Sequence, residues 1–282
     1  MLVGDDPSVD DALTPDSPTP TPGAVTYDFR GRVFLVTGVS RRQGIGAAIA
    51  RQLAGAGADL VLHSWSPHDV ERPGLADPDG AAVVAAECER LGARVTRVSA
   101  DFADPSAPAQ VMAQAVREHA HVDGVVANHA RDGGGTLETI DAAELDLCFA
   151  VNARATALLV KEFAAQHDGR PGGRAVLFTS GQHHGGMPGE LPYVISKGAV
   201  QQMTASLAVH LAPRGITVNC VNPGPTDTGW ADAAQERWVR ERMPQGRWGT
   251  PEDAARLVTW LLSDDGQWVC GQTLDSEGGF GR

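Results

Sequence analysis

The sequence lacks the features of a membrane protein, a secreted disulfide protein and a classical metal motif. Its 282 residues include no apolar run near the ~18 residues of a membrane span, and no cationic-then-apolar start typical of a secretory signal. The four cysteines, Cys88, Cys148, Cys220 and Cys270, are scattered without close pairs. We therefore expect small core cysteines in a reduced, cytoplasmic protein without a membrane partner.

Basic charge is also scarce. The formal net charge is −12, which argues against binding of nucleic acid, since that function needs a basic face. Residues 1–27 contain five aspartates and five prolines but no lysine or arginine. Such a segment buries too little apolar surface to offset its ordering entropy, so we expect a disordered tail, with a docking arm as the alternative.

The remainder, residues 28–282, has the length and pattern of one α/β domain. Short apolar runs without alternation, typical of strands covered on both faces, are separated by alanine-rich segments. Asp77-Pro78, Asp104-Pro105 and Thr250-Pro251 predict helix starts. We expect a Rossmann-like doubly wound parallel sheet of about seven strands with helices on both faces. The predicted strands are Arg32–Thr37, Asp59–His63, Arg94–Ser99, Val122–Ala127, Ala175–Thr179, Thr217–Val221 and Thr273–Leu274.

A glycine-rich turn follows the first predicted strand. Gly38, Gly44 and Gly46 stand between that strand and an alanine-rich helix. Glycines let the backbone approach a pyrophosphate, and a helix N-terminus offers free N–H groups to it. A tight connection is the plain alternative, but the position in a βαβ unit favours a dinucleotide site.

The second predicted strand bears on the choice of cofactor. An NAD site places an acid there, whereas this chain has Ser64 in His63-Ser64-Trp65-Ser66 and no carboxylate before Asp69. Arg41 and Arg42 in the glycine-rich turn could hold a 2′-phosphate. We therefore favour NADP(H), with NAD(H) as the alternative.

Two rare side chains stand one helical turn apart. The chain has two tyrosines and two lysines against 21 arginines, and Tyr193 and Lys197 are one of each. Residues four apart on a helix share a face, so the lysine should lower the pKa of the phenol. Ser180 lies thirteen residues upstream, with a hydroxyl able to polarise a carbonyl.

Taken in order along residues 28–280, these motifs resemble the short-chain dehydrogenase/reductase family, most closely the 3-oxoacyl-carrier-protein reductase type. The resemblance implies that Asn152 holds a water in a proton relay and that Ser180 hydrogen-bonds the substrate carbonyl. It further implies that Tyr193 is the general acid or base and that Lys197 lowers its pKa and binds the nicotinamide ribose.

The resemblance also implies cofactor contacts outside these four residues. Asp101-Phe102 is similar to the pair that brackets adenine, and Asn128 to the asparagine beside the nicotinamide. The turn after the sixth strand is similar to one that closes over the carboxamide. The implied contacts are Gly38, Ser40, Arg41, Arg42, Gly44, Ile45, Gly46, Ser64, Asp101, Phe102, Asn128, Tyr193, Lys197, Pro223, Gly224, Thr226 and Thr228.

Five residues rather than the usual three separate Gly38 from Gly44, a longer turn that resembles the enoyl reductase branch. That branch spaces its tyrosine and lysine seven apart, unlike Tyr193 and Lys197.

Two segments should set substrate specificity, Gly181–Pro192 and Gly229–Trp248. The first contains His183 and His184, for which no acid or cysteine shares the spacing, so we expect a plain loop and no metal. The second contains three tryptophans that could form a mobile lid or anchor a surface helix.

The sequence thus predicts an NADP(H)-dependent enzyme that interconverts a ketone and a secondary alcohol. A 3-oxoacyl thioester and a small carbonyl compound are the candidate substrates. An enoyl reductase and a catalytically silent nucleotide-binding regulator are the alternatives. The family resemblance implies a homo-oligomer, a dimer or tetramer, built on the helices that carry Asn152 and Tyr193.

Overall fold

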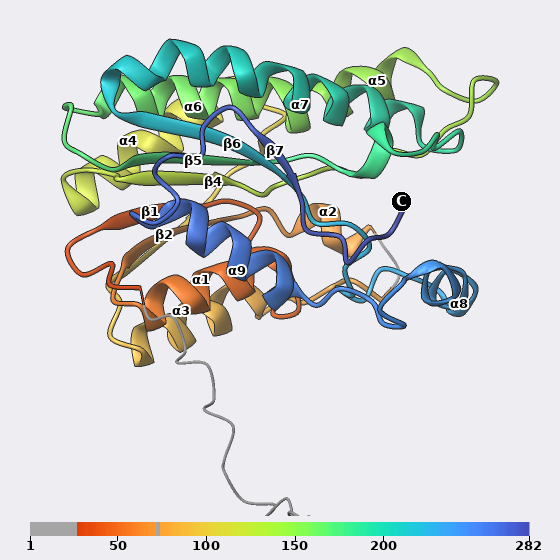
Figure 1. The fold of residues 1–282 in the computed structure, drawn as a ribbon, viewed down its shortest axis with the longest axis horizontal. Helices are drawn as coiled ribbons and strands as arrows, with labels where there is room; N and C mark the ends of the chain where they lie inside the picture. Colours follow the sequence, from red (N-terminus) through yellow and green to blue (C-terminus); the bar gives the residue numbers. More distant parts are fainter. Residues whose placement is uncertain (1–26, 72–73, 282) are drawn as a thin grey trace, which may run out of the picture.

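The computed structural model describes residues 27–71 and 74–281. The segment for which a disordered tail is predicted lies, except for Tyr27, outside the described residues. The described chain folds into three layers, a central sheet between two layers of helices (Figure 1). No helix in these ranges is long and apolar enough to cross a membrane.

The central sheet has seven parallel strands in the order β3-β2-β1-β4-β5-β6-β7. The order reverses after β1, so the chain winds outward in both directions, as a doubly wound fold requires. The fold class predicted from the sequence is confirmed. The seven predicted strands are also confirmed, and their ends lie within three residues of the predicted ones. The strands are β1 (Val33–Val36), β2 (Asp59–Ser64), β3 (Val95–Ser99), β4 (Gly124–Ala127), β5 (Gly173–Phe178), β6 (Ile216–Asn222) and β7 (Thr273–Asp275).

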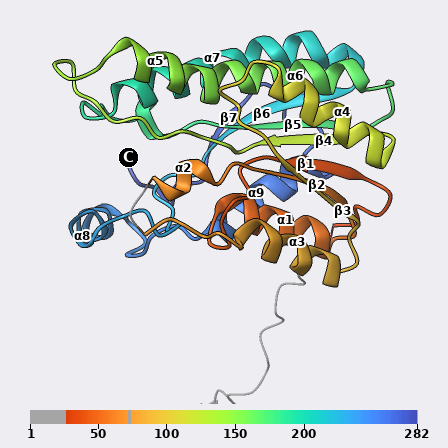
Figure 2. The same cartoon turned by 180° about the vertical axis from the view of Figure 1, so that it is seen from behind.

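Helices cover both faces of the sheet, and each face has its own apolar core (Figures 1 and 2). On one face lie α4 (Ala107–His119), α6 (Ala155–Gln166) and α7 (Leu191–Leu211). On the other lie α1 (Ile45–Gly55), α3 (Gly80–Arg90) and α9 (Pro251–Leu262). Central strands such as β1 and β4 are buried at every position, which explains their apolar runs without alternation.

One of the three predicted helix starts is confirmed, and two are displaced. Thr250 caps α9 in a capping box with Asp253. By contrast α3 begins after Asp79 and α4 after Ser106, two residues beyond the predicted caps. Asp77 and Asp104 instead form turns before those helices: the backbone N–H of Gly80 donates to the carbonyl oxygen of Asp77, and that of Ser106 donates to the carboxylate of Asp104.

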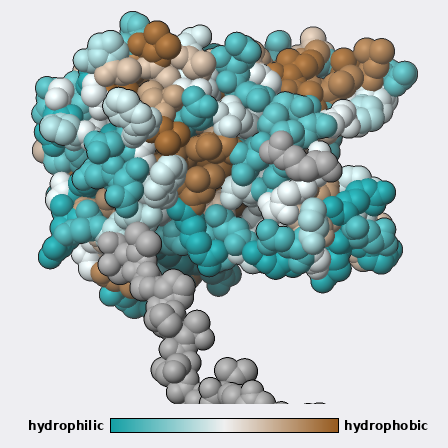
Figure 3. All heavy atoms as spheres, viewed as in Figure 1, coloured by the Kyte–Doolittle hydropathy of each residue, from teal (hydrophilic) through white to brown (hydrophobic). Residues whose placement is uncertain are grey.

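Shorter elements gather at the edge where the strands end. They are α2 (Pro67–Val70) after β2, α5 (Ala142–Cys148) after β4, a 3₁₀ turn at Gly181–His183 after β5, and α8 (Ala233–Arg242) after β6. Figure 3 shows the molecule indented at this edge, between the part that carries α5 and the part that carries α8. A second 3₁₀ turn, Ala212–Arg214, follows α7. The carboxyl edge of a doubly wound sheet is where such folds bind ligands.

Candidate active site

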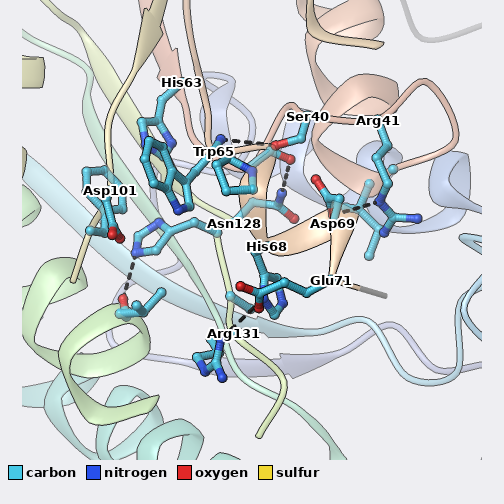
Figure 4. A pocket seen from close by; sticks show the side chains of 18 of the residues that line it. Ser40, Arg41, His63, Trp65, His68, Asp69, Glu71, Asp101, Asn128 and Arg131 are labelled. Atoms are coloured by element: carbon cyan, nitrogen blue, oxygen red, sulfur yellow. Dashed lines mark hydrogen bonds and ion pairs between the residues drawn. The ribbon is translucent and has the colours of Figure 1, made fainter. Parts of the chain in front are cut away.

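A cavity of about 500 Å³ opens at the carboxyl edge of the sheet, with walls from the segments after β1, β2, β3 and β4 (Figure 4). These segments are far apart in sequence and meet here because parallel strands end at one edge. The cavity brings together ten of the predicted cofactor-binding residues: Gly38, Ser40, Arg41, Gly44, Ile45, Asp101, Phe102, Asn128, Tyr193 and Thr228.

The glycine-rich turn packs too closely for side chains at two positions. Gly38 has a φ of 73°, and a Cβ there would lie 2.9 Å from the Cα of His129. A Cβ on Gly46 would lie 2.6 Å from the carbonyl oxygen of Gly38. The first turn of α1 has neither a side-chain cap nor an acidic residue, so its N–H groups suit an anion.

Asn128 holds this turn in place. Its Nδ2 donates to the carbonyl oxygens of Thr37 and Gly38 at 3.0 and 3.2 Å. The hydroxyl of Thr37 accepts from the backbone N–H of Asn128 and contacts Nδ1 of His129 at 2.7 Å. The segment after β4 is therefore fixed to the glycine-rich turn.

The two arginines of the turn have different surroundings. Arg41 lines the cavity, donates to the carbonyl of Thr228 at 2.6 Å and lies 3.3 Å from Asp69 (Figure 4). Arg42 does not line it, because its guanidinium is paired with Asp77 at 2.6 Å. Asp69 is the first carboxylate after β2 in the sequence, and α2 places it on the cavity wall. Burial raises the pKa of Asp69.

The wall beyond β3 is aromatic. The ring of His63 stacks on Phe102 with centroids 4.1 Å apart, and Phe102 meets His129 edge to face. Burial lowers the pKa of His63 to about 4, so this ring is neutral at physiological pH. Asp101 accepts from the backbone N–H of Ala103 and turns the chain at the cavity rim.

Tyr193 lies at one end of the cavity, on α7 with Lys197 one turn later. The Nζ of Lys197 lies 5.7 Å from the Tyr193 ring centroid and donates to the carbonyl oxygen of Phe178 at 2.9 Å. Lys197 is 2% exposed. Ser180, two residues after β5, is close enough to Tyr193 to lower the pKa of its phenol. The predicted tyrosine, lysine and serine thus meet at one place.

The electrostatics of this group differ from the sequence-based expectation. Burial raises the pKa of Tyr193 to about 12, and the hydrogen bond from Ser180 opposes that rise. Burial lowers the pKa of Lys197 to about 8. The expected lowering of the phenol pKa by Lys197 is not seen here, because desolvation dominates and the nearby carboxylates of Glu190 and Asp132 raise the pKa further.

Asn152 lies in a π-helical turn, Phe149–Arg154, that joins α5 to α6. Its Oδ1 accepts from the N–H of Arg131 at 2.7 Å. Its Nδ2 donates to the carbonyl of Arg131 and to the hydroxyl of Ser196, each at 2.8 Å. The side chain therefore connects the segment after β4 to α7, beside Tyr193. Single π turns within α-helices are frequent at functional sites.

Several predicted contacts do not reach the cavity surface. Ser180, Lys197 and Asn152 do not line the cavity. The turn after β6 reaches the cavity only through Thr228. The remaining predicted contacts that do not line it are Arg42, Gly46, Ser64, Pro223, Gly224 and Thr226.

Sequence reasoning missed the α2 segment and Arg131. Trp65, His68, Asp69 and Glu71 follow β2 and line the cavity. Arg131 pairs with Glu144 at 2.9 Å. Its guanidinium also lies 3.4 Å from Nδ1 of His68, so the segments after β2 and β4 are in contact at the cavity wall (Figure 4). Their position directly after strands β2 and β4 was the available signal.

The tryptophans of the second specificity segment differ in burial, which bears on whether they anchor a surface helix or form a mobile lid. Trp248 is buried with Val239 and Met243, and its Nε1 donates to the carbonyl of Glu236 at 3.1 Å. It anchors α8 to the body. Trp230 packs edge to face on Trp248 at 5.6 Å but is 46% exposed.

Comparison with known proteins agrees with this geometry. The model of the family described as enoyl-(acyl carrier protein) reductase matches residues 38–281. The uncharacterized oxidoreductase YjdA of Bacillus subtilis (strain 168) is 36% identical over 253 residues, covering 89% of this chain and 97% of YjdA.

Two solved structures are similar throughout. The angucycline C-6 ketoreductase LanV with bound NADP has a TM-score of 0.80 and 31% identity, covering 90% of this chain and 96% of LanV. A short chain dehydrogenase from Burkholderia cenocepacia J2315 in complex with NADP has a TM-score of 0.80 and 33% identity, covering 89% and 98%. With the parallel sheet, the glycine-rich turn and the Tyr193–Lys197 pair at its carboxyl edge, the chain belongs to the short-chain dehydrogenase/reductase family of oxidoreductases.

Proposed function

We propose that this enzyme is an NADP(H)-dependent reductase of a ketone, with Tyr193 as proton donor. The observation that carries the proposal is that Tyr193 lines the same cavity as the glycine-rich turn, with Lys197 one helical turn later and Ser180 close to its phenol.

The residues present fit a dinucleotide. The close packing at Gly38 leaves backbone on the cavity wall, and the uncapped start of α1 suits a pyrophosphate. Gly38, Gly44 and Ile45 would hold the pyrophosphate, Asp101 and Phe102 the adenine, and Tyr193 and Lys197 the nicotinamide ribose. The bound nicotinamide supplies the hydride.

The protein's own part is proton transfer and orientation. Ser180 hydrogen-bonds the carbonyl oxygen, and Tyr193 gives its phenol proton to the same oxygen as negative charge develops there. A phenol with a pKa of about 12 is protonated at neutral pH and so has a proton to give. Lys197 supplies positive charge behind the phenol. Asn152 is a positioning residue, since its side-chain atoms are committed to Arg131 and Ser196.

Relatives support a ketone substrate, as LanV is named a ketoreductase, whereas the matching family model is described as an enoyl reductase. The spacing of four between Tyr193 and Lys197 favours the first. The test is NADPH oxidation with a 3-oxoacyl thioester, its enoyl analogue and a panel of small ketones. Turnover of the enoyl compound alone would overturn the proposal. Tight NADPH binding without any turnover would support a silent regulator instead.

The preference for NADP(H) rests on Arg41 at the cavity wall and is supported by the NADP named in both solved relatives. The carboxylate of Asp69 would repel a 2′-phosphate, and it would compete with that phosphate for the guanidinium of Arg41. We expect Arg41→Ala to lower kcat/KM for NADPH at least tenfold with little change for NADH. Asp69→Asn should raise the preference for NADPH. Arg42→Ala is the matched control, since Arg42 faces Asp77, and an equal loss in both arginine variants would contradict the assignment.

A further inference from the structure

Two adjacent histidines of the predicted specificity segment Gly181–Pro192 lie next to an aspartate from a distant strand. His183 ends the 3₁₀ turn after β5, His184 follows it, and Asp275 ends β7. Nε2 of His183 lies 3.3 Å from Oδ1 of Asp275, and Nε2 of His184 lies 2.9 Å from Oδ2. The three ligand atoms all lie within 4.8 Å of one another. The acid partner that sequence spacing did not reveal is therefore supplied by the fold.

The hydrogen bond made by one nitrogen of the His183 ring determines which nitrogen faces the aspartate. Nδ1 of His183 lies 3.2 Å from the carbonyl oxygen of Ser180, which can only accept a hydrogen bond. Nδ1 therefore donates to this carbonyl, which leaves Nε2 as the nitrogen that faces Asp275. Metal-binding histidines commonly donate their other ring N–H to a carbonyl in this way.

The contact of His184 with Asp275 also lacks the geometry of a hydrogen bond. Nε2 of His184 is buried and has no hydrogen-bond partner, despite its 2.9 Å distance from the carboxylate. The two ring centroids are only 3.8 Å apart, so both imidazoles face the same carboxylate. A cation bound between the two rings and the carboxylate would give the buried nitrogen of His184 a partner.

The carboxylate of Asp275 also accepts a hydrogen bond from a neighbouring strand. Nδ2 of Asn222, at the end of β6, donates to Oδ1 of Asp275 at 2.9 Å. This fixes the aspartate relative to the sheet, as an outer partner of a metal ligand does.

We propose that His183, His184 and Asp275 bind a divalent transition-metal ion such as Zn²⁺, with a further coordination position open. Tetrahedral zinc with bonds of about 2.0–2.1 Å places its donors about 3.3 Å apart. Nε2 of His183 lies 3.3 Å from Oδ1 of Asp275 and Nε2 of His184 lies 2.9 Å from Oδ2, so each imidazole nitrogen is near this spacing from one of the two carboxylate oxygens. Imidazole and carboxylate ligands suit zinc and neighbouring metals.

The ion would fix the specificity segment. It would join the turn after Ser180 to β7, and the carbonyl of Ser180 is already bonded to His183. Metal binding should therefore order the segment between Ser180 and Tyr193 and stabilise the fold, without taking part in hydride transfer.

The test is direct binding of metal to the full chain, purified without a histidine tag and treated with a chelator. We expect one Co²⁺ per chain to give a visible absorption band that Zn²⁺ abolishes stoichiometrically. Zn²⁺ at about a hundredfold its Kd should raise Tm by about 5–10 °C. These readouts do not need turnover, so they remain informative if the proposed reductase activity is wrong.

Matched variants locate the site. Asp275→Asn keeps an acceptor for Asn222, and His184→Gln removes a second ligand; each should weaken Zn²⁺ binding at least about tenfold. His210→Gln and Asp265→Asn, exposed residues outside the cluster, should leave it unchanged. Absence of the Co²⁺ band in the wild-type chain, or equal Zn²⁺ affinity in all four variants, would overturn the proposal and leave a histidine–carboxylate ion pair.

Discussion

At the scale of single residues, the Tyr193 hydroxyl is the group on which the proposed chemistry depends. Ser180, just after β5, lies close to the phenol, and the amine of Lys197 on α7 lies 5.7 Å from the centre of its ring. Removing only this oxygen leaves the ring and the cavity wall in place. The effect on turnover can therefore be separated from any effect on folding.

We expect Tyr193→Phe to lower kcat by about 10²–10⁴-fold, the usual contribution of a positioned proton donor. The Kd for NADPH should stay within a few-fold, as measured by fluorescence titration. Tyr27→Phe, at the other tyrosine of the chain, is the control and should keep full activity. Turnover retained in Tyr193→Phe would remove the tyrosine from the mechanism.

Lys197 illustrates the energetic cost of a buried charge. Its amine is 2% exposed, and burial lowers its pKa from 10.5 to about 8. At pH 7 the lysine is charged in both folded and unfolded chains, and only the folded chain carries the desolvation penalty. Between about pH 8 and 10.5 the unfolded chain binds the extra proton, so this residue makes stability rise with pH.

We therefore expect Lys197→Met to be more stable than the wild type at pH 7, by about 1–3 kcal/mol, while losing activity. The difference in free energy of unfolding should shrink as pH rises toward 10. Urea unfolding of both proteins at several pH values measures this. A gap that does not change with pH would show that Lys197 is not the titrating group.

At the scale of elements, the contact between the glycine-rich turn and the segment after β4 determines the cofactor end of the cavity. A Cβ at Gly46 would meet the carbonyl of Gly38 at 2.6 Å and Nδ2 of Asn128 at 2.9 Å. Both neighbours are fixed by hydrogen bonds, so neither can move without disturbing the turn.

Gly46→Ala should destabilise the protein by about 1–3 kcal/mol and weaken NADPH binding, because the turn must shift away from the start of α1. Gly55→Ala, at the other end of the same helix, has no atom within 4 Å of the added carbon. It should be neutral or stabilise by up to about 1 kcal/mol. Thermal unfolding of both variants compares them, and equal effects would contradict the steric argument.

At the scale of the whole molecule, exposed apolar side chains occur on the helices that carry the active-site residues. Ile195 and Val209 on α7 are 52% and 78% exposed, and Phe149 beside α5 is 48% exposed. Large apolar side chains left exposed on neighbouring helices can form a contact surface. They support the proposal of a homo-oligomer built on these helices.

Val209→Glu is expected to shift the protein toward smaller species in sedimentation velocity, because it would place a charge in that contact. Leu91→Glu, at the end of α3 on the opposite face of the sheet, is the control and should leave the sedimentation coefficient unchanged. A wild-type monomer at micromolar concentration would refute the homo-oligomer.

The sequence by itself determined the fold class, the strand positions and the residues of the Tyr193 cluster. These follow from local information, namely apolar runs between helical segments, the glycine-rich turn and the one-turn spacing to Lys197. Only the tertiary structure decided which residues face the cavity and how strongly each is buried. It turned Arg42 away toward Asp77, returned Asp69 to the wall, brought Asp275 to the histidines and raised the pKa of Tyr193 instead of lowering it. Such contacts join segments up to about ninety residues apart, and desolvation depends on everything packed around a group, so neither is encoded in local spacing.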